Sequence, residues 1–130
     1  WLQNIGTYRC QLVGPRRYIL NSEPNQTANR MIARALERGE KSMPIAMILG
    51  QDPVTWMVSG TRVPVSPRKP ADEYAYVGGL RGKPLEIVKC DLSDLTVPAH
   101  CEVVLEGTLD LTQPLEEGPY HEAYGYLGDR

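Results

Sequence analysis

Three glutamates near the C-terminal end of this 130-residue chain form its densest group of potentially reactive side chains. Glu116, Glu117 and Glu122 flank Gly118-Pro119, where a tight turn can fold Glu117 and Glu122 toward one point. Two neighbouring carboxylates raise each other's proton affinity, which keeps one of them protonated for general-acid work. On spacing alone, a solvated acidic turn is the alternative interpretation.

Arg9 is a candidate cation for a carboxylate site. It lies on the polar side of an alternating segment, where a guanidinium can bind a carboxylate through two parallel hydrogen bonds, although a surface arginine fits the same pattern. Asn4 and Glu73 offer an amide oxygen and a carboxylate, which are ligand types that hard cations prefer. Their spacing in the sequence carries little information by itself.

The histidines and cysteines do not follow a zinc-ligand spacing. The cysteines form neither a CxxC motif nor an even set, so we interpret them as reduced intracellular thiols that pack in the core rather than as nucleophiles. The glycines at 78, 79 and 82 match neither a dinucleotide-binding nor a Walker motif. The histidines are His100 and His121, and the cysteines are Cys10, Cys90 and Cys101.

The element that positions Arg9 is predicted to be a β-strand. Residues 5–13 alternate in polarity and would place Thr7, Arg9 and Gln11 on one face. Residues 14–17 carry turn signals, and the next four residues are short and apolar. We therefore expect a hairpin with a four-residue connection.

Three helices are indicated farther along the chain. From Gln26 the apolar residues follow helical spacing, and Asn25 is the expected N-cap. Asp52-Pro53 has the residue types of an N-cap followed by the first helical position. Residues 71–80 form the third candidate, which places Glu73 in a first helical turn.

Strands are expected at residues 44–50, 85–90 and 101–109, and the last of these would place Cys101, Val103 and Leu105 on one face. Short strands combined with two or three short helices predict an α+β fold built on a small barrel or curved sheet.

Composition excludes several classes of function. Lys and Arg total 14 against 16 Asp and Glu, a net charge of -2, which disfavours binding to nucleic acid or to an anionic membrane. The longest apolar run, residues 43–49, is far shorter than the roughly 18 residues that span a bilayer. We predict a single cytoplasmic domain over residues 1–130, cut from a longer polypeptide because it begins with Trp1.

Four segments together resemble the UbiD family of prenylated-flavin-dependent decarboxylases. They are NIGTYR at 4–9, DEYAYVGGLRGKPLEIVKCD at 72–91, VPAHCEVVLEG at 97–107 and EGPYHEAYGY at 117–126. The resemblance covers nearly the whole chain in the family's order and spacing. It implies the central cofactor-binding domain, with a split β-barrel of the FMN-binding type.

The resemblance also implies roles for individual residues. Asn4 and Glu73 correspond to ligands of a Mn²⁺ ion that bridges to the cofactor phosphate, with K⁺ nearby. Arg9 corresponds to the arginine beside the flavin ring, and Glu117 and Glu122 to the acids of an Arg-Glu-Glu network, which favours catalysis over a solvated turn. The implied cofactor-binding residues are Asn4, Ile5, Gly6, Thr7, Tyr8, Arg9, Gln26, Thr27 and Glu73.

The implied reaction is reversible, non-oxidative decarboxylation of an aromatic or α,β-unsaturated acid with prenylated FMN, and Glu122 donates the proton. Implied partners are the acid substrate, the remaining segments of the parent polypeptide and further copies of the whole protein. The chain departs from the family pattern twice: residues 24–28 contain no His, and His121 stands between the two acids. A flavin-binding barrel without catalysis, or an assembly module, is the alternative.

Overall fold

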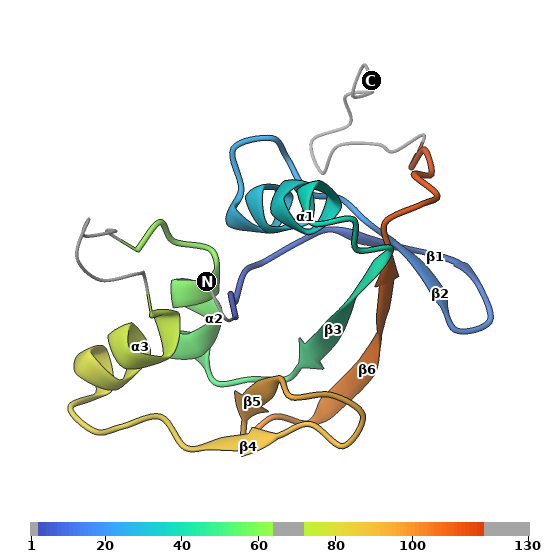
Figure 1. The fold of residues 1–130 in the computed structure, drawn as a ribbon. Coiled ribbons are helices and arrows are strands. Elements are labelled where there is room, and N and C mark those ends of the chain that lie inside the picture. Colours follow the sequence, from blue (N-terminus) through green and yellow to red (C-terminus); the bar gives the residue numbers. More distant parts are fainter. Residues whose placement is uncertain (1–2, 64–71, 119–130) are drawn as a thin grey trace, which may run out of the picture.

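The computed structural model describes residues 3–63 and 72–118, which form a mixed α+β fold (Figure 1). The described residues contain three helices and six strands, and the strands pair into three separate two-stranded antiparallel sheets. In chain order the elements are β1 (Cys10–Gly14), β2 (Arg17–Leu20), α1 (Thr27–Glu37), β3 (Ser42–Leu49), α2 (Pro53–Ser59), α3 (Glu73–Arg81), β4 (Ile87–Lys89), β5 (Thr96–Pro98) and β6 (Val103–Asp110).

The predicted hairpin is the β1–β2 sheet, but its connection is shorter than expected. Gly14 pairs with Arg17, so only Pro15 and Arg16 lie between the strands, and Arg16 has a φ of 59°. Pro15 fixes its own φ, and Arg16 accepts the left-handed conformation that closes the turn. The first strand begins only at Cys10, five residues later than predicted, because the Ile5 and Thr7 N–H groups bond to Glu73 and Ser59 instead of to a strand.

The other sheets join segments that are distant in sequence. Strand β3 pairs with β6 over eight residues, from Ser42 opposite Asp110 to Leu49 opposite Val103. Strand β4 pairs with β5 over three residues. The sequence missed β5, which is short and ends in Pro98.

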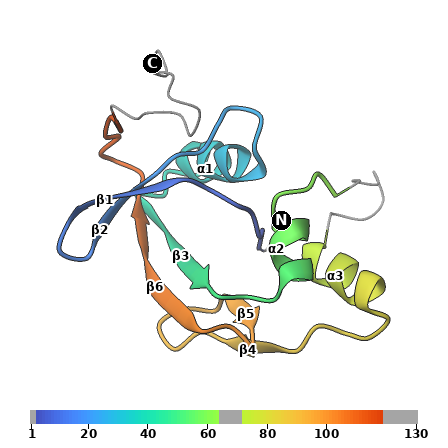
Figure 2. The ribbon, with the colours of Figure 1, turned by 180° about the vertical axis from the view of Figure 1, so that it is seen from behind.

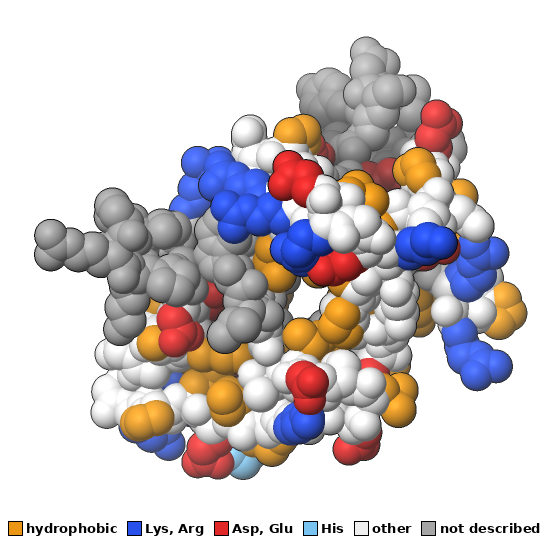
Figure 3. All heavy atoms as spheres, viewed as in Figure 1, with side chains coloured by type: hydrophobic (Ala, Val, Ile, Leu, Met, Phe, Trp, Pro, Cys, Tyr) orange, Lys and Arg blue, Asp and Glu red, His pale blue; other side chains and the backbone are white. Residues whose placement is uncertain are grey.

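The α+β class is confirmed, whereas a barrel is not detected in the strand pairing of the described residues, so the split barrel stays a prediction. The three sheets and the helices instead surround an open middle, as two opposite views agree (Figure 1; Figure 2). In the space-filling view a gap remains between side chains near the centre of that face (Figure 3).

The buried core is correspondingly small and lies where α2 and α3 meet β5. Val58, Thr55, Val77 and Pro98 are the largest fully buried side chains. Many large apolar side chains are nevertheless exposed. On α2 and α3 these are Trp56, Met57, Tyr76 and Leu80. Such unburied apolar surface is typical of a face that another protein segment covers.

Local capping explains where the helices begin and end. Asp52 accepts the backbone N–H groups of Val54 and Thr55 at 3.1 and 3.2 Å, which confirms the predicted start of α2. For α1 the expected Asn25 cap is wrong: the N-cap is Gln26, and its side chain does not cap the helix. The helix ends in a Schellman motif, where Gly39 has a φ of 75° and its N–H donates to Leu36.

The face of β6 that the sequence predicted to be apolar is more exposed than its opposite face. Val103 and Leu105 are 44% and 38% exposed, whereas Glu106 is less exposed and accepts the backbone N–H groups of Asp91 and Leu92. Within the described residues, no helix combines the length and apolarity needed to cross a lipid bilayer.

Candidate active site

The segment of residues 3–9 crosses the molecule from the helices α2 and α3 to the β1–β2 hairpin (Figure 1). Thr7 ties it to the end of α2, since its N–H donates to the Ser59 carbonyl at 3.1 Å and the two hydroxyls lie 2.7 Å apart. At the start of α3, the Glu73 carboxylate accepts the backbone N–H of Ile5. Residues that are far apart in sequence are therefore held beside the NIGTYR motif.

Asn4 is oriented by Tyr8. Its amide nitrogen donates to the Tyr8 hydroxyl at 3.1 Å. The amide oxygen, which is the atom that binds cations, therefore points away from Tyr8. The Tyr8 ring lies against Gly6, and a Cβ at Gly6 would approach it to 2.5 Å. A side chain at position 6 would therefore push the Tyr8 ring out of this position.

Glu73 is half-buried at the start of α3, and burial raises the pKa of its carboxyl group. The nearby charge of Asp72 adds to this shift, and the backbone N–H groups of Glu73 and Ile5 oppose it. The Asn4 amide oxygen and this carboxylate are both hard oxygen donors. Across the described residues no three His, Cys, Asp or Glu side chains gather as a metal-binding group. A cation here would take its remaining ligands from phosphate or water.

A second cluster surrounds Glu117. Arg9 holds this carboxylate at both oxygens: Nε donates to Oε2 at 3.3 Å, and Nη2 bonds and ion-pairs with Oε1. The Asn21 amide also donates to Oε1. The Glu117 side chain is only 10% exposed, whereas the Arg9 side chain is 37% exposed. The carboxylate is therefore nearly buried, and the guanidinium contacts it from the solvent side.

Backbone pairing explains how these groups meet. The Asn21 N–H donates to the Arg9 carbonyl at 3.0 Å, which extends the hairpin by one pair and sets Asn21 opposite Arg9. Gln11, which the alternation places on the face of Arg9, accepts the Gly118 N–H at 3.1 Å. Sequence reasoning identified Arg9 and Glu117 but not Asn21 or Gln11. The shared face was the available signal for Gln11.

Gln26 and Thr27 lie at the start of α1. The Gln26 Oε1 atom accepts the Glu23 N–H at 2.9 Å, and no acidic residue occupies the first turn. The first N–H groups of α1 therefore have no side-chain cap, and such groups can bind an anion.

Comparison with known proteins decides the family. The family model for the UbiD "3-octaprenyl-4-hydroxybenzoate carboxy-lyase Rift-related domain" matches residues 1–130. The chain belongs to the UbiD family.

Solved UbiD-class structures agree with this assignment. The HmfF enzyme of Pelotomaculum thermopropionicum, solved with FMN, is 30% identical with a TM-score of 0.81, over 97% of this chain and 27% of its own. The vanillic acid decarboxylase of Sedimentibacter hydroxybenzoicus, in its closed form, is 34% identical with a TM-score of 0.84, over 97% and 26%. The chain thus spans about a quarter of the length of these relatives.

Two positions of interest to a UbiD-family site, Glu122 and His121, lie outside the described residues. Burial, and then the Glu117 charge, raises the pKa of the Cys10 thiol, and burial raises that of Cys90, which disfavours the reactive thiolate at these two positions. Sequence reasoning also missed Gln3, Tyr74 and Thr96, which bond to one another beside Asn4 and Glu73. Burial raises the pKa of Tyr74 to about 12, so its hydroxyl stays protonated.

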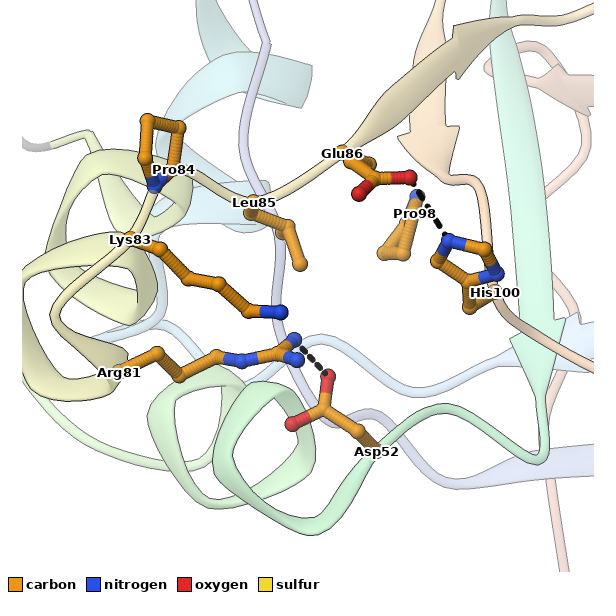
Figure 4. A pocket seen from close by; sticks show the side chains of 8 residues that line it. All are labelled: Asp52, Arg81, Lys83, Pro84, Leu85, Glu86, Pro98 and His100. Atoms are coloured by element: carbon orange, nitrogen blue, oxygen red, sulfur yellow. Dashed lines mark hydrogen bonds and ion pairs between the residues drawn. The ribbon is translucent and has the colours of Figure 1, made fainter.

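A small pocket lies apart from the NIGTYR segment, between the end of α3 and strand β5 (Figure 4). Arg81 points across it toward Asp52 at 3.3 Å, and His100 bonds Glu86 at 2.8 Å. Glu86 and His100 are 72% and 80% exposed, so solvent screens this second pair strongly. We assign the pocket no role in the UbiD-family site.

Proposed function

We propose that this chain is the cofactor-binding domain of a decarboxylase that acts on an aromatic or α,β-unsaturated carboxylic acid with prenylated FMN. The observation that carries the proposal is the nearly buried Glu117 carboxylate, which Arg9 binds at both oxygens in a chain of the UbiD family. A solvated acidic turn would leave this carboxylate in water, without a fixed guanidinium.

Arg9 has two tasks in this proposal. Its guanidinium holds Glu117, and because the Arg9 side chain is 37% exposed, it would also donate hydrogen bonds to a substrate carboxylate. The ion pair with Glu117 would hold the guanidinium in one orientation for that contact. Asn21 and Gln11 keep the acid and its backbone in place.

Glu122 is the proposed proton donor. The carbon–carbon bond to the carboxylate breaks, CO₂ leaves, and the proton of the Glu122 carboxylic acid ends on the carbon that lost CO₂. Glu122 becomes a carboxylate and is reprotonated from solvent. A donor of this kind needs a raised pKa, which the nearby Glu117 charge would supply. When bound, the prenylated flavin supplies the electrophile that accepts the electron pair.

The residues present fit the cofactor's phosphate and metal. Asn4 and Glu73 would bind Mn²⁺, since their oxygens suit a hard cation and burial makes the Glu73 charge costly. Gln26 and Thr27 would meet the phosphate at the uncapped start of α1. A K⁺ ion would share this oxygen-rich environment.

We propose that the remaining segments of a longer polypeptide, and further copies of the protein in a homo-oligomer, cover the exposed apolar side chains of α2 and α3. Trp56 and Leu80 are 61% and 54% exposed here. We propose that such contacts, together with the acid substrate, are the partners of this domain.

The decisive experiment is reconstitution of the full-length protein with prenylated FMN and Mn²⁺. We expect a flavin spectrum, and CO₂ release from some members of a panel of cinnamic and benzoic acids. Glu122→Gln should retain the flavin spectrum and lose turnover by about 100-fold or more. Glu116→Gln, a neighbouring exposed acid, is the matched control and should turn over normally.

Two results would contradict the proposal. Undiminished turnover in Glu122→Gln would remove the assignment of the proton donor. Flavin binding without CO₂ release from any acid would favour the non-catalytic flavin-binding alternative, which the lack of a His in residues 24–28 favours mildly.

A further inference from the structure

Gln3, Tyr74 and Thr96 form a hydrogen-bonded cluster that joins three distant parts of the chain. Gln3 Nε2 donates to the Tyr74 hydroxyl at 3.0 Å and to the Thr96 carbonyl at 2.6 Å. The Tyr74 hydroxyl donates to the same carbonyl at 2.7 Å. Gln3 Oε1 accepts the Thr96 N–H at 2.9 Å and the Thr96 hydroxyl at 3.2 Å. Every polar atom of the Gln3 amide is therefore used.

The Gln3 amide takes the place of a neighbouring strand. Strand β5 pairs with β4 on one side, where Ala99 donates to the Glu86 carbonyl and Cys90 donates to the Leu95 carbonyl. The N–H and carbonyl of Thr96 point to the other side, and the Gln3 side chain satisfies both. One amide thus fixes the position of the N-terminal segment along the edge of β5.

The cluster is adjacent in sequence to both proposed metal ligands. Gln3 precedes Asn4, and Tyr74 follows Glu73. A further bond joins the two segments directly, since the Glu73 carboxylate accepts the Ile5 N–H. Fixing Gln3 against Tyr74 therefore sets how far the Asn4 backbone lies from that of Glu73, while the cluster's own polar atoms bind one another.

We propose that Gln3, Tyr74 and Thr96 act as positioning residues that set the separation of Asn4 and Glu73 and thereby the affinity of the Mn²⁺ site. This inference rests on the proposed function, which supplies the metal. Partners that orient metal ligands typically change metal affinity by about 10- to 100-fold when they are removed. Two hydrogen bonds end on the Tyr74 hydroxyl, so its loss should have an effect in that range.

The test is Mn²⁺ binding to the full-length protein with FMN, followed by the electron paramagnetic resonance signal of free Mn²⁺. Tyr74→Phe keeps the ring and removes only the hydroxyl, and we expect Mn²⁺ affinity to fall about tenfold. Gln3→Leu should cost more, because it removes every bond of the amide. Thr96→Val should cost least, because Thr96 acts mainly through its backbone.

Tyr18→Phe is the matched control, on strand β2 with a side chain that is 46% exposed, and it should bind Mn²⁺ like the wild type. Positioning also predicts that Tyr74→Phe regains wild-type turnover at saturating Mn²⁺. A turnover defect that saturating Mn²⁺ does not relieve, together with a lower melting temperature, would show a general structural role and overturn the inference.

Glu73→Gln separates this inference from the proposed function. If Glu73→Gln loses Mn²⁺ while Tyr74→Phe binds it with wild-type affinity, the metal site stands and the positioning role is wrong. If Glu73→Gln binds Mn²⁺ like the wild type, the proposed metal site itself is wrong, and the inference fails with it.

Discussion

The cluster around Glu117 and the cluster around Glu73 stabilise their acids in opposite ways. Glu117 is bound directly by the groups proposed to act with it, namely the Arg9 guanidinium and the Asn21 amide. The Glu73 carboxylate accepts the backbone N–H groups of Ile5 and of Glu73 itself, and the side-chain hydrogen bonds beside it belong to its sequence neighbour Tyr74. The first acid is therefore bound by a guanidinium, whereas backbone N–H groups hold the second.

This difference suggests how one short segment serves two chemistries. Asn4 and Arg9 are five residues apart, so an extended chain separates them by at most about 18 Å. At one end of the segment Arg9 supplies the counter-charge of Glu117, and at the other end Asn4 and Glu73 are the proposed ligands of an ion. Variants that alter one cluster should leave the other cluster's readout unchanged.

The largest expected effect is that of Glu117→Gln. The amide cannot neutralise Arg9, so the guanidinium would lose its fixed partner, and we expect CO₂ release to fall about 100-fold or more. Mn²⁺ affinity should stay at the wild-type value. Turnover assays combined with a Mn²⁺ titration check both statements, and a parallel loss of Mn²⁺ would mean that the clusters are not independent.

Asn4→Ala should show the converse pattern. It removes a proposed ligand oxygen, so Mn²⁺ affinity should fall by at least about tenfold, while Arg9 and Glu117 remain paired. Asn21→Ala is the matched control, because Asn21 belongs to the other cluster. Equal Mn²⁺ affinities for the two variants, measured by electron paramagnetic resonance, would contradict the assignment of Asn4.

Asp52→Ala probes the helices that support the Glu73 cluster. Asp52 caps α2 and pairs with Arg81 of α3, so its loss should lower the free energy of unfolding by about 1–2 kcal/mol. Urea unfolding of variant and wild type measures the difference. An unchanged unfolding midpoint would show that the cap is dispensable.

The Asp52 contribution should also depend on pH. Burial raises its pKa, but hydrogen bonds from Thr55 and the Arg81 charge outweigh burial and hold the pKa below its ordinary value. In the unfolded chain the pKa of an Asp carboxyl group is about 3.9. The stabilisation by Asp52 is therefore complete above that pH, and it is lost as the pH falls through the lower pKa of the folded state. The difference between Asp52→Ala and wild type should therefore shrink below about pH 4.

The smallest expected effect is that of Asn21→Ala. The Glu117 carboxylate would lose one hydrogen bond and keep both bonds from Arg9, so turnover should fall by less than about tenfold. Steady-state CO₂ release at saturating substrate is the measurement. A loss as large as that of Glu117→Gln would mean that Asn21 has a role beyond orienting the acid.

Features set by neighbouring residues could be predicted from the sequence. The Asp52-Pro53 start of α2 and the place of Glu73 in the first turn of α3 follow from short-range capping. The hairpin also follows, although Arg16 in a left-handed conformation shortens its turn. The Asn25 cap failed because Gln26 occupies that position without using its side chain to cap the helix.

Features set by long-range bonding could not be predicted. Strand β5 is too short and too interrupted by Pro98 to give a pattern, and Gln3 bonds its edge from 93 positions away. The alternation of residues 5–13 predicted a strand, but Thr7 and Ile5 bond to helix ends instead. Arg9 and Glu117 were singled out by type, and the family resemblance implied that they share an Arg-Glu-Glu network. The spacing of the residues alone could not predict their pairing across 108 positions, which the structure shows.

The Gln3 amide makes the Thr96 backbone N–H a natural reporter. That hydrogen is protected by a side chain rather than by a strand, so its exchange with deuterium measures how often the N-terminal segment leaves the edge of β5. Amides within β3 and β6 depend on strand pairing and need no such contact. The exchange rate of one amide thus follows the docking of the NIGTYR segment separately from the unfolding of the sheets.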